Sequence, residues 1–306
     1  MEKLSHFLTL KDLTQQQFLA LIDLAKQVKT NPAQFSQALA GKSLVTLYEK
    51  PSLRTRVSFD IGIAKLGGHS VYLDQNNGAL GKRESVADFA KNISCWADGI
   101  VARTFSHKTV EQLAEFGTVP VINSLSDMYH PCQALADFLA LAEQFDDLSK
   151  IKLVYIGDGN NVTHSLMIAA ALAGSEMVVI CPEGHFPDGK VVQETQEIAK
   201  QHGGSLVLST ELTAAQGADA VYTDTWISMG DNVSLQDIEA KFSPYQVNQQ
   251  LMDSLQLNFF MHCQPAHIGE EVTQQVFDGE KSLVLVQAEN RMHAQNAVMI
   301  TLLGNL

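Results

Sequence analysis

The feature that most constrains the fold is the alternation of short apolar runs with longer amphipathic stretches. Helices cover both faces of a parallel sheet, so its strands read as short, nearly continuous apolar runs. Runs of this kind predict strands at 43–48, 70–73, 99–103, 119–123, 152–157, 177–181, 205–208, 220–223 and 259–262. Amphipathic stretches predict helices near 14–28, 130–144, 165–173, 191–201 and 288–303. The pattern is typical of an α/β protein with parallel sheets.

The alternation falls into two series, which predicts two lobes. The first series closes near Asp127, and a helix from His130 leads to the second, which begins at Lys152. Pro131 suits the first turn of that helix, because a missing N–H costs nothing there. We therefore expect two lobes, each a mainly parallel sheet flanked by helices, joined by interdomain helices. The expected domains are residues 1–129 with 289–306, and residues 130–288.

Composition excludes several classes of function. The formal net charge of −13 disfavours nucleic acid as a partner, because phosphate backbones are bound by clustered Lys and Arg. No apolar run reaches the roughly 20 residues of a membrane helix, and the N-terminus lacks the order of a secretory signal. The cysteines, without a CxxC pair, argue against a disulfide framework or structural zinc. We expect a cytoplasmic protein without membrane contact or a structural metal site.

The basic segment from Lys50 to Arg56 follows the first predicted strand and is the strongest candidate site. It places Ser52, Thr55 and three cations at a strand-to-helix junction. Unpaired N–H groups at a helix N-terminus bind phosphate, and a guanidinium adds a planar fork of donors. The alternative is an ordinary N-cap with surface arginines. We favour an anion site and assign it Arg54, since Arg56, two residues on, points elsewhere on a helix.

Other polar residues follow predicted strands in the same half, where ligands of open α/β sheets gather. Arg103 ends a buried strand, where a cation seldom stands without a partner. His130 and Gln133 are three apart, so both can face one side of the helix start. A histidine there is pushed towards its neutral form and can donate to a carbonyl oxygen, although a capped helix with a satisfied histidine is an equal alternative. Arg291 is a further cation of unassigned purpose.

The second half offers weaker signals. Asp224 follows a predicted strand and could hold an amine, while Ser228 and the Met229 backbone could bind the polar end of an amino acid. An ordinary strand-to-loop turn is the commoner explanation. Cys263 ends another strand beside a histidine. Such a cysteine is usually a packing residue, and the alternative is a thiolate nucleophile.

The segment from Gly157 to Asn161 resembles the start of a dinucleotide fingerprint. Val162 stands where the third glycine belongs, and a lone GxG is weak evidence. An NAD-dependent oxidoreductase is therefore disfavoured. Asn161 can still offer its side chain to another ligand.

Taken together and in order, five motifs resemble the aspartate/ornithine carbamoyltransferase superfamily, and within it the ornithine branch. They are Ser-x-Arg-Thr-Arg at 52–56, His-Pro-x-Gln at 130–133, Asp-x-x-x-Ser-Met-Gly at 224–230, His-Cys-x-Pro at 262–265 and Glu-Asn-Arg-Met-His at 289–293. The similarity spans essentially the whole chain. It implies transfer of the carbamoyl group of carbamoyl phosphate to the δ-amine of L-ornithine, giving L-citrulline and phosphate in arginine biosynthesis, with no cofactor.

The resemblance also implies residue roles. The catalytic residues would be Arg54, Arg103, His130 and Cys263. Carbamoyl phosphate would be bound by Ser52, Leu53, Arg54, Thr55, Arg103, His130, Gln133, Cys263, Gln264 and Arg291. Ornithine would be bound by Asn161, Asp224, Ser228, Met229 and Cys263. The first expected domain would therefore bind carbamoyl phosphate and the second ornithine. Family members are commonly trimers that lend a loop, here 76–82, to a neighbouring site, which implies a homotrimer or a multiple of trimers.

Three positions depart from the family pattern. Leu53 stands where most members have Thr, which removes one hydroxyl but leaves the backbone N–H. Gln264 replaces the usual Leu, and Ala79 aligns where some members place a Gln that reaches the neighbouring site. These departures concern affinity more than the type of reaction.

We hypothesise direct attack of neutral ornithine on the carbamoyl carbon, with the oxyanion stabilised by Arg54, Arg103 and His130. A covalent carbamoyl-thioester on Cys263 is the competing chemistry. Alternative acceptors are putrescine, an acylated ornithine or aspartate. A non-catalytic module that senses amino acids is an alternative of another class.

Overall fold

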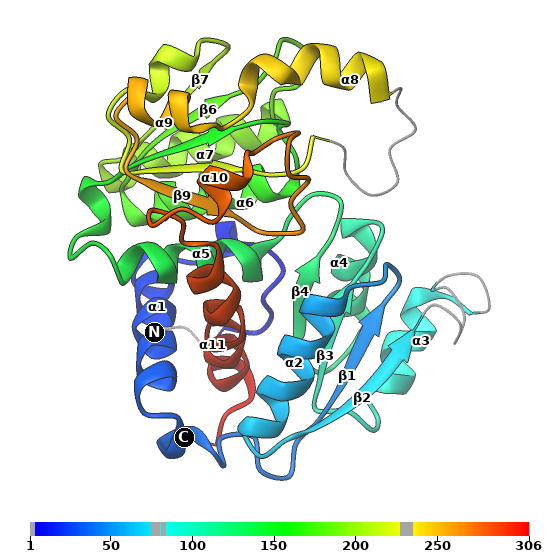
Figure 1. The fold of residues 1–306 in the computed structure, drawn as a ribbon. Helices are drawn as coiled ribbons and strands as arrows, with labels where there is room; N and C mark the ends of the chain where they lie inside the picture. The colour runs from blue at the N-terminus through cyan, green and yellow to red at the C-terminus, as the bar shows by residue number, and fades with distance from the viewer. Residues whose placement is uncertain (1–3, 75–79, 81–83, 227–234, 306) are drawn as a thin grey trace. The chain divides into compact units, whose positions relative to one another are not determined.

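The computed structural model describes residues 4–74, 80, 84–226 and 235–305. Contacts divide the chain into two units, Met1–Leu139 with Glu289–Leu306, and Ala140–Ala288. Both boundaries fall inside long helices, α5 (Pro131–Ala142) and α11 (Val284–Leu303) (Figure 1). The predicted fold class, two α/β lobes joined by helices, is confirmed. The assignment of carbamoyl phosphate to the first unit and of ornithine to the second stays a prediction.

The first unit contains a four-stranded parallel sheet in the order β2-β1-β3-β4. Its strands are β1 (Ser43–Tyr48), β2 (His69–Asp74), β3 (Gly99–Arg103) and β4 (Val121–Leu125). Its other helices are α1 (Gln15–Thr30), α2 (Leu53–Lys65), α3 (Val86–Ile93) and α4 (His107–Phe116). All of β3 is buried, as expected for a strand covered on both faces. The apolar stripe of α1 is buried too, and Phe18 packs edge-on against Phe138 of α5.

The second unit contains a five-stranded parallel sheet in the order β7-β6-β5-β8-β9. Its strands are β5 (Lys152–Ile156), β6 (Glu176–Ile180), β7 (Ser205–Ser209), β8 (Ala220–Thr223) and β9 (Phe259–His262). Its helices are α6 (Asn161–Ala173), α7 (Gly189–His202), α8 (Leu235–Phe242), α9 (Gln249–Ser254) and α10 (Gln274–Phe277). Short 3₁₀ turns among the described residues of the two units are Leu10–Asp12, Pro32–Phe35, Leu148–Lys150, Leu212–Ala215 and Ser243–Tyr245.

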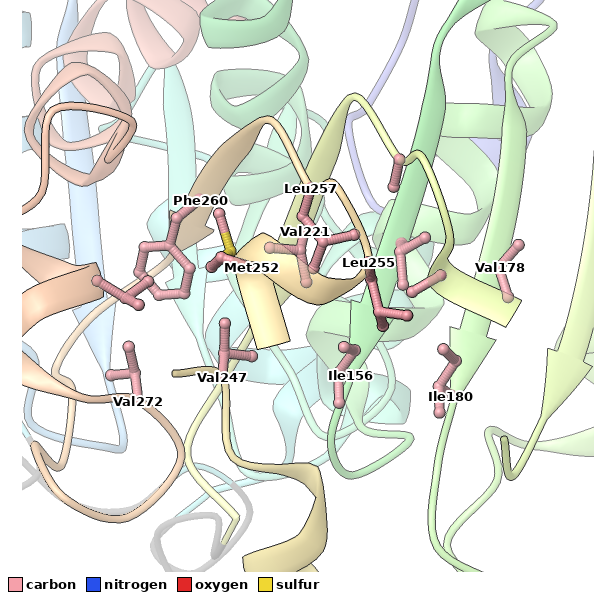
Figure 2. Packing of buried hydrophobic residues seen from close by; sticks show 14 of the residues in the cluster. Ile156, Val178, Ile180, Val221, Val247, Met252, Leu255, Leu257, Phe260 and Val272 are labelled. Atoms are coloured by element: carbon pink, nitrogen blue, oxygen red, sulfur yellow. The ribbon is translucent and has the colours of Figure 1, made fainter. Parts of the chain in front are cut away.

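One apolar cluster fixes the second sheet in place (Figure 2). Ile156 and Ile180 extend from neighbouring strands into the same layer as Phe260 of β9, and Met252 of α9 packs into it. Burying each side chain of this size stabilises the fold by about 1.5–3 kcal/mol. The cluster thereby fixes the strands whose carboxyl ends carry the polar residues of this unit.

Several elements begin or end differently from the prediction. Strand β4 lies two residues later than predicted, and its Ile122 bridges Phe7 of the N-terminal segment. Helix α6 begins at Asn161 rather than at residue 165, because Asn160 caps it. Helix α11 begins at Val284, so Arg291 lies in the helix interior and not at its start. Among the described residues, no helix is long and apolar enough to cross a membrane.

Candidate active site

The order of the first sheet creates a switch point between β1 and β3. The chain leaves β1 towards β2 on one side, whereas β3 and β4 lie on the other (Figure 1). Tyr48 and Arg103, the last residues of β1 and β3, are paired in register. In open α/β sheets ligands bind at such a point, beyond the carboxyl ends of the strands. The basic segment that follows β1 therefore lies where a ligand is expected.

Helix α2 begins in this segment and is capped by Ser52, so the alternative of an N-cap is correct for Ser52. The Ser52 side chain accepts a hydrogen bond from the Thr55 N–H at 3.4 Å. Leu53 is 78% exposed, and Arg54 in the first turn is also exposed. A helix leaves its first N–H groups without intrahelical partners. The cap and an anion site are compatible, because the cap uses only one of these donors.

Two arginines converge on one hydroxyl beside this helix start. Arg103 Nη1 lies 3.5 Å and Arg291 Nη2 lies 2.9 Å from Thr55 Oγ1. Arg291 Nη1 also donates to Gln133 Oε1 at 2.7 Å, and Gln133 Nε2 donates to Asp137 at 2.7 Å. The sequence-predicted residues 55, 103, 133 and 291 are therefore joined in one network, and Arg54 is next to Thr55 in the chain.

The cations of this network are buried, and the charge of Arg291 is incompletely compensated. Arg103 and Arg291 are each only 6% exposed. Within the described part of the chain, Arg291 forms no ion pair with a carboxylate, and its Nε is buried without a hydrogen-bond partner. A buried charge is costly unless an opposite charge and hydrogen bonds compensate it. The network is therefore suited to a multiply charged anion.

His130 is kept neutral by its surroundings. Burial lowers the pKa of His130 well below its ordinary value, and the charges of Arg291 and Arg103 lower it further. A neutral imidazole can donate one hydrogen bond to a carbonyl oxygen without adding charge. This agrees with the expectation from the sequence, but the cause is mainly burial.

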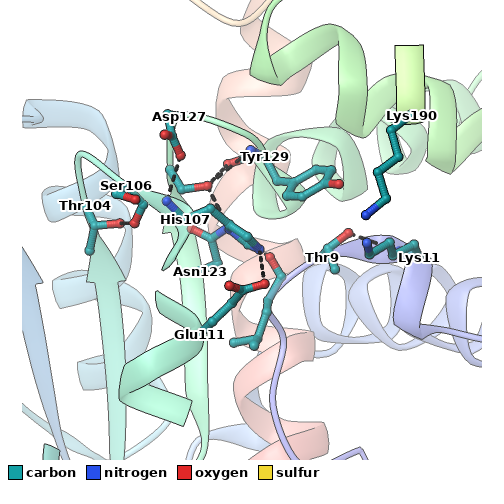
Figure 3. Close-up of polar contacts among 12 residues, drawn as sticks. Thr9, Lys11, Thr104, Ser106, His107, Glu111, Asn123, Asp127, Tyr129 and Lys190 are labelled. Carbon is teal, nitrogen blue, oxygen red and sulfur yellow. Dashed lines mark hydrogen bonds and ion pairs between the residues drawn. The ribbon is translucent and has the colours of Figure 1, made fainter. Parts of the chain in front are cut away.

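A network around His107 fixes the turn that leads to His130 (Figure 3). The Ser126 N–H donates to the Tyr129 carbonyl at 2.9 Å. In return, the Tyr129 N–H donates to the Ser126 hydroxyl at 3.1 Å. The His107 N–H donates to Asp127 at 2.6 Å, and its ring Nδ1 lies 3.0 Å from Ser126 Oγ. His107 was not among the residues predicted from the sequence. The one feature of the sequence that could have indicated His107 is its position shortly after the predicted strand 99–103.

The neutral state of His130 predicts how stability depends on pH. In the unfolded chain the His130 imidazole binds a proton near pH 6.5, whereas in the folded protein it binds this proton only at lower pH. This contribution to stability is therefore present above pH 6.5 and is lost as the pH falls, by up to about 1.4 kcal/mol per pH unit. In urea unfolding between pH 7 and 5, His130→Asn should lose less stability than the parent. An equal slope for both proteins would contradict the assignment.

The second sheet has its switch point between β5 and β8, and polar residues follow both strands. Asn160 and Asn161 follow β5, and Asp224 follows β8 directly. Cys263 follows β9, the neighbour of β8. Asp224 is 8% exposed, and Cys263 Sγ donates to its Oδ1 at 3.1 Å. The structure thus brings Asp224 and Cys263 together.

Asn160, which was not predicted as a site residue, contacts the same carboxylate. Its Nδ2 donates to Asp224 Oδ2 at 3.0 Å, while its Oδ1 accepts the N–H groups of Val162 and Thr163. Asn161 is the first residue of α6. The residue type of Asn160 could have indicated its role at the helix start, because Asn is a favoured N-cap residue.

The backbone after Cys263 is held by a buried histidine. The Gln264 N–H donates to His262 Nδ1 at 2.9 Å, so His262 Nε2 carries the hydrogen that faces Glu271 at 3.1 Å. Gln264 has a φ of 61°, a left-handed conformation that is uncommon outside glycine. His262 and Glu271 thus impose an unusual path on the backbone at residue 264.

Two groups of side chains in this unit have metal-ligating atoms within 4.8 Å of one another, Asp224-His262-Cys263 and His267-Glu270-Glu271. In the first, both ring nitrogens of His262 already have hydrogen-bond partners. In the second, Glu271 accepts from the buried His262 and from the His267 N–H. Hydrogen bonding therefore explains both groups.

The GxG segment also has a structural explanation. The Gly159 N–H donates to the His185 carbonyl at 2.9 Å. A Cβ at Gly159 would lie 2.3 Å from Pro187 N and 2.6 Å from the Phe186 carbonyl carbon. Glycine is required there because the loop before α7 approaches closely, not because a dinucleotide must be accommodated.

Some predicted residues lie outside the described part of the chain. These are Ser228 and Met229, and residues 76–79 and 81–82 of the loop expected to reach a neighbouring subunit, including Ala79. Their roles stay predictions.

Known proteins resemble this chain along its whole length. Residues 5–143 match the carbamoyl-P binding domain of aspartate/ornithine carbamoyltransferase, and residues 149–302 match its Asp/Orn binding domain. An ornithine carbamoyltransferase of Shewanella oneidensis is 68% identical over 299 residues, which cover 98% of this chain and 99% of that protein. A Pyrococcus furiosus relative, named an anabolic ornithine carbamoyltransferase, is 44% identical over 303 residues, covering 98% and 96%. The solved structure of ornithine carbamoyltransferase from P. furiosus superposes with a TM-score of 0.96 at 43% identity, covering both chains completely.

Proposed function

Because the chain belongs to the aspartate/ornithine carbamoyltransferase family, we propose that it transfers the carbamoyl group of carbamoyl phosphate to the δ-amine of L-ornithine, giving L-citrulline and phosphate. The observation that carries the proposal is the convergence of Arg103 and Arg291 on Thr55 at the switch point of the first sheet. Two buried guanidinium groups beside a helix N-terminus are suited to a phosphate ester.

Carbamoyl phosphate is assigned to the first unit. Its phosphate is bound by the segment that starts α2 and by the two buried arginines, that is Ser52, Leu53, Arg54, Thr55, Arg103 and Arg291. His130 donates to the carbamoyl oxygen, and Gln133 contacts the carbamoyl amine. Neutrality of His130 supports this role, since a neutral imidazole donates without competing for the phosphate. The backbone carbonyls of Cys263 and Gln264 are proposed to accept from the carbamoyl nitrogen, as the family resemblance implies.

Ornithine is assigned to the second unit. Its α-amino and carboxylate groups are bound by Asn161, Asp224, Ser228 and Met229, and Cys263 lies near the δ-amine. The position of Asp224 at the second switch point supports an ammonium site, because its buried carboxylate carries a charge that an α-ammonium would compensate.

The reaction is a direct displacement. The lone pair of the neutral δ-amine forms the new C–N bond, the C–O bond to phosphate breaks, and the amine releases one proton. Arg54, Arg103 and His130 stabilise the oxyanion that forms on the way. An amine of this kind has a pKa of about 10 in water, so the site must favour its neutral form. Phosphate is a good leaving group, which is why the chemistry calls for no thioester on Cys263.

The proposal extends to the setting of the enzyme. We place it in the cytoplasm and in arginine biosynthesis, supported by four free cysteines and by the anabolic relative. We also propose a homotrimer or a multiple of trimers, in which loop 76–82 serves a neighbouring site. Sedimentation equilibrium tests the assembly, and a monomer at assay concentration would contradict it.

A colorimetric citrulline assay with carbamoyl phosphate and an acceptor panel tests the function. We expect turnover with L-ornithine, and little with putrescine, N-acetylornithine or aspartate. Preference for another acceptor would overturn the assignment of ornithine. Binding of either substrate without turnover would instead indicate a non-catalytic sensor.

Leu53 offers a test of the departure from the family pattern. Leu53→Thr adds a hydroxyl at an exposed position in the first turn of α2, next to the proposed phosphate. One added hydrogen bond is worth about 0.5–1.5 kcal/mol. We therefore expect KM for carbamoyl phosphate to fall roughly 2- to 12-fold, with KM for ornithine unchanged. Leu53→Ala, which adds no hydroxyl, is the control, and an equal fall in that variant would refute the explanation.

A further inference from the structure

We infer that Asn160 is a positioning residue that orients the Asp224 carboxylate for ornithine. The inference rests on the proposed function and assigns a role to a residue outside the predicted substrate contacts. Asn160 lies between β5 and α6, and Asp224 lies directly after β8, the strand next to β5 in the sheet. The contact between them is the 3.0 Å hydrogen bond from Nδ2 to Oδ2.

The helix cap decides which end of the Asn160 amide faces Asp224. Its Oδ1 accepts the Val162 N–H at 2.9 Å and the Thr163 N–H at 3.2 Å. A flipped amide would place an NH₂ group against these two donors and its oxygen against a carboxylate. Both contacts would then be repulsive, so the donor must face Asp224.

The turn that carries Asn160 is itself held from several sides. The Asp158 carbonyl accepts from the Tyr155 hydroxyl at 2.8 Å and from Thr163 Oγ1 at 3.1 Å. The Gly159 N–H is bound to the His185 carbonyl, and the Asn160 N–H donates to the Asp158 carbonyl, both at 2.9 Å. Nδ2 is therefore presented from a fixed backbone.

Asn160 and Cys263 together fix the plane of the carboxylate. Cys263 donates to Oδ1 from the end of β9, and Asn160 donates to Oδ2 from the start of α6. Each carboxylate oxygen keeps a further lone pair for an ammonium ligand. Without the whole Asn160 side chain, the Val162 and Thr163 N–H groups would lose their acceptor and could compete for the carboxylate. Asn160 satisfies those groups and leaves Asp224 available to the substrate.

Asn160→Asp separates this role from helix capping. Aspartate is as good an N-cap as asparagine, and a negative charge suits a helix N-terminus, so α6 should keep its cap. Only the donor that faces Asp224 is replaced by an acceptor. We expect kcat/KM for ornithine to fall about 10- to 150-fold, the loss typical of a hydrogen bond to a charged group. KM for carbamoyl phosphate should stay at the parent value.

A matched control is available in the same unit. Asn248 caps α9 by accepting the Leu251 N–H at 2.9 Å, and among the described residues its side chain contacts no carboxylate. Asn248→Asp should leave both KM values unchanged. Asn160→Ala, which loses cap and donor together, should show the ornithine defect and also a lower Tm.

The pH dependence of kcat/KM for ornithine distinguishes the positioning role from helix capping, because a change in capping alone would not alter it. In Asn160→Asp, the introduced carboxylate and that of Asp224 would be like charges that share a proton, which restores a hydrogen bond as the pH falls. We expect the ratio of variant to parent kcat/KM for ornithine to rise from pH 9 to pH 6. Other titratable groups near the pair are Tyr155, Asp158, His262 and Cys263, and they are common to both proteins.

The outcomes separate the inference from the proposed function. If the parent makes no citrulline, the proposed function fails. If the parent does so and Asn160→Asp keeps its kcat/KM for ornithine with a flat pH ratio, only the inference is overturned. An equal loss for both substrates would also contradict a positioning role directed at Asp224.

Discussion

Replacing Arg103 with methionine should lower kcat/KM for carbamoyl phosphate by about a thousandfold and leave the protein folded. Loss of one preorganised donor to a developing oxyanion costs about 10²–10³ in rate, and here a phosphate contact is lost as well. Steady-state citrulline formation measures the effect. The variant should fold, because the flexible methionine side chain can occupy the space of the aliphatic stem of the arginine.

The stability of the variant must be measured beside its activity. Arg103 is 6% exposed and lies 3.5 Å from Thr55 Oγ1, so its side chain is part of the packed interior. A cooperative thermal transition near the Tm of the parent would show that the loss of activity does not come from unfolding. The control is Arg56→Met, since Arg56 is an exposed arginine of the same segment that pairs with Asp60 and stacks on Tyr72. Unchanged activity in Arg103→Met, or a loss as large in Arg56→Met, would refute the assignment.

Replacing Asp224 with asparagine should remove most of the affinity for ornithine. The change keeps the shape of the side chain and removes the charge that would pair with the α-ammonium group. Losing one partner of a buried charge pair costs 2–5 kcal/mol, or about 30- to 5,000-fold. KM for ornithine should rise by an amount in this range, with the effect measured at saturating carbamoyl phosphate.

The same variant has an internal control in the other substrate. KM for carbamoyl phosphate should change little, because Asp224 is assigned only to ornithine. Asp219→Asn provides a matched aspartate in the same unit, where the carboxylate accepts the Lys152 N–H at the opposite end of the sheet from Asp224. An Asp224→Asn enzyme with the parent's KM for ornithine would show that the amino acid binds elsewhere.

The fold was predictable because local and long-range signals agree in this chain. The runs 43–48, 99–103, 220–223 and 259–262 form strands with the predicted bounds, since a parallel strand buried on both faces leaves an unbroken apolar run. Bounds set by side-chain capping were less predictable. The start of α6 depends on Asn160, whose cap no apolar periodicity reveals.

The sequence predicted the site residues that belong to motifs with unusual charge. It did not predict the residues that hold those site residues in position. Thr55, Arg103 and Arg291 were all named from the sequence, and the structure brings them together. His107 and Asn160 were not, because each acts through another residue across a turn. Such contacts depend on tertiary placement, which sequence spacing does not encode.

Isothermal titration calorimetry with phosphonoacetamide, which has a methylene in place of the bridging oxygen of carbamoyl phosphate, tests the central claim most directly. The claim is that the buried cations around Thr55 bind the phosphate. The parent should bind the analogue, and Arg103→Met should bind it at least about 100-fold more weakly, in keeping with the loss of a charged contact. Equal affinity of the two proteins would contradict the account.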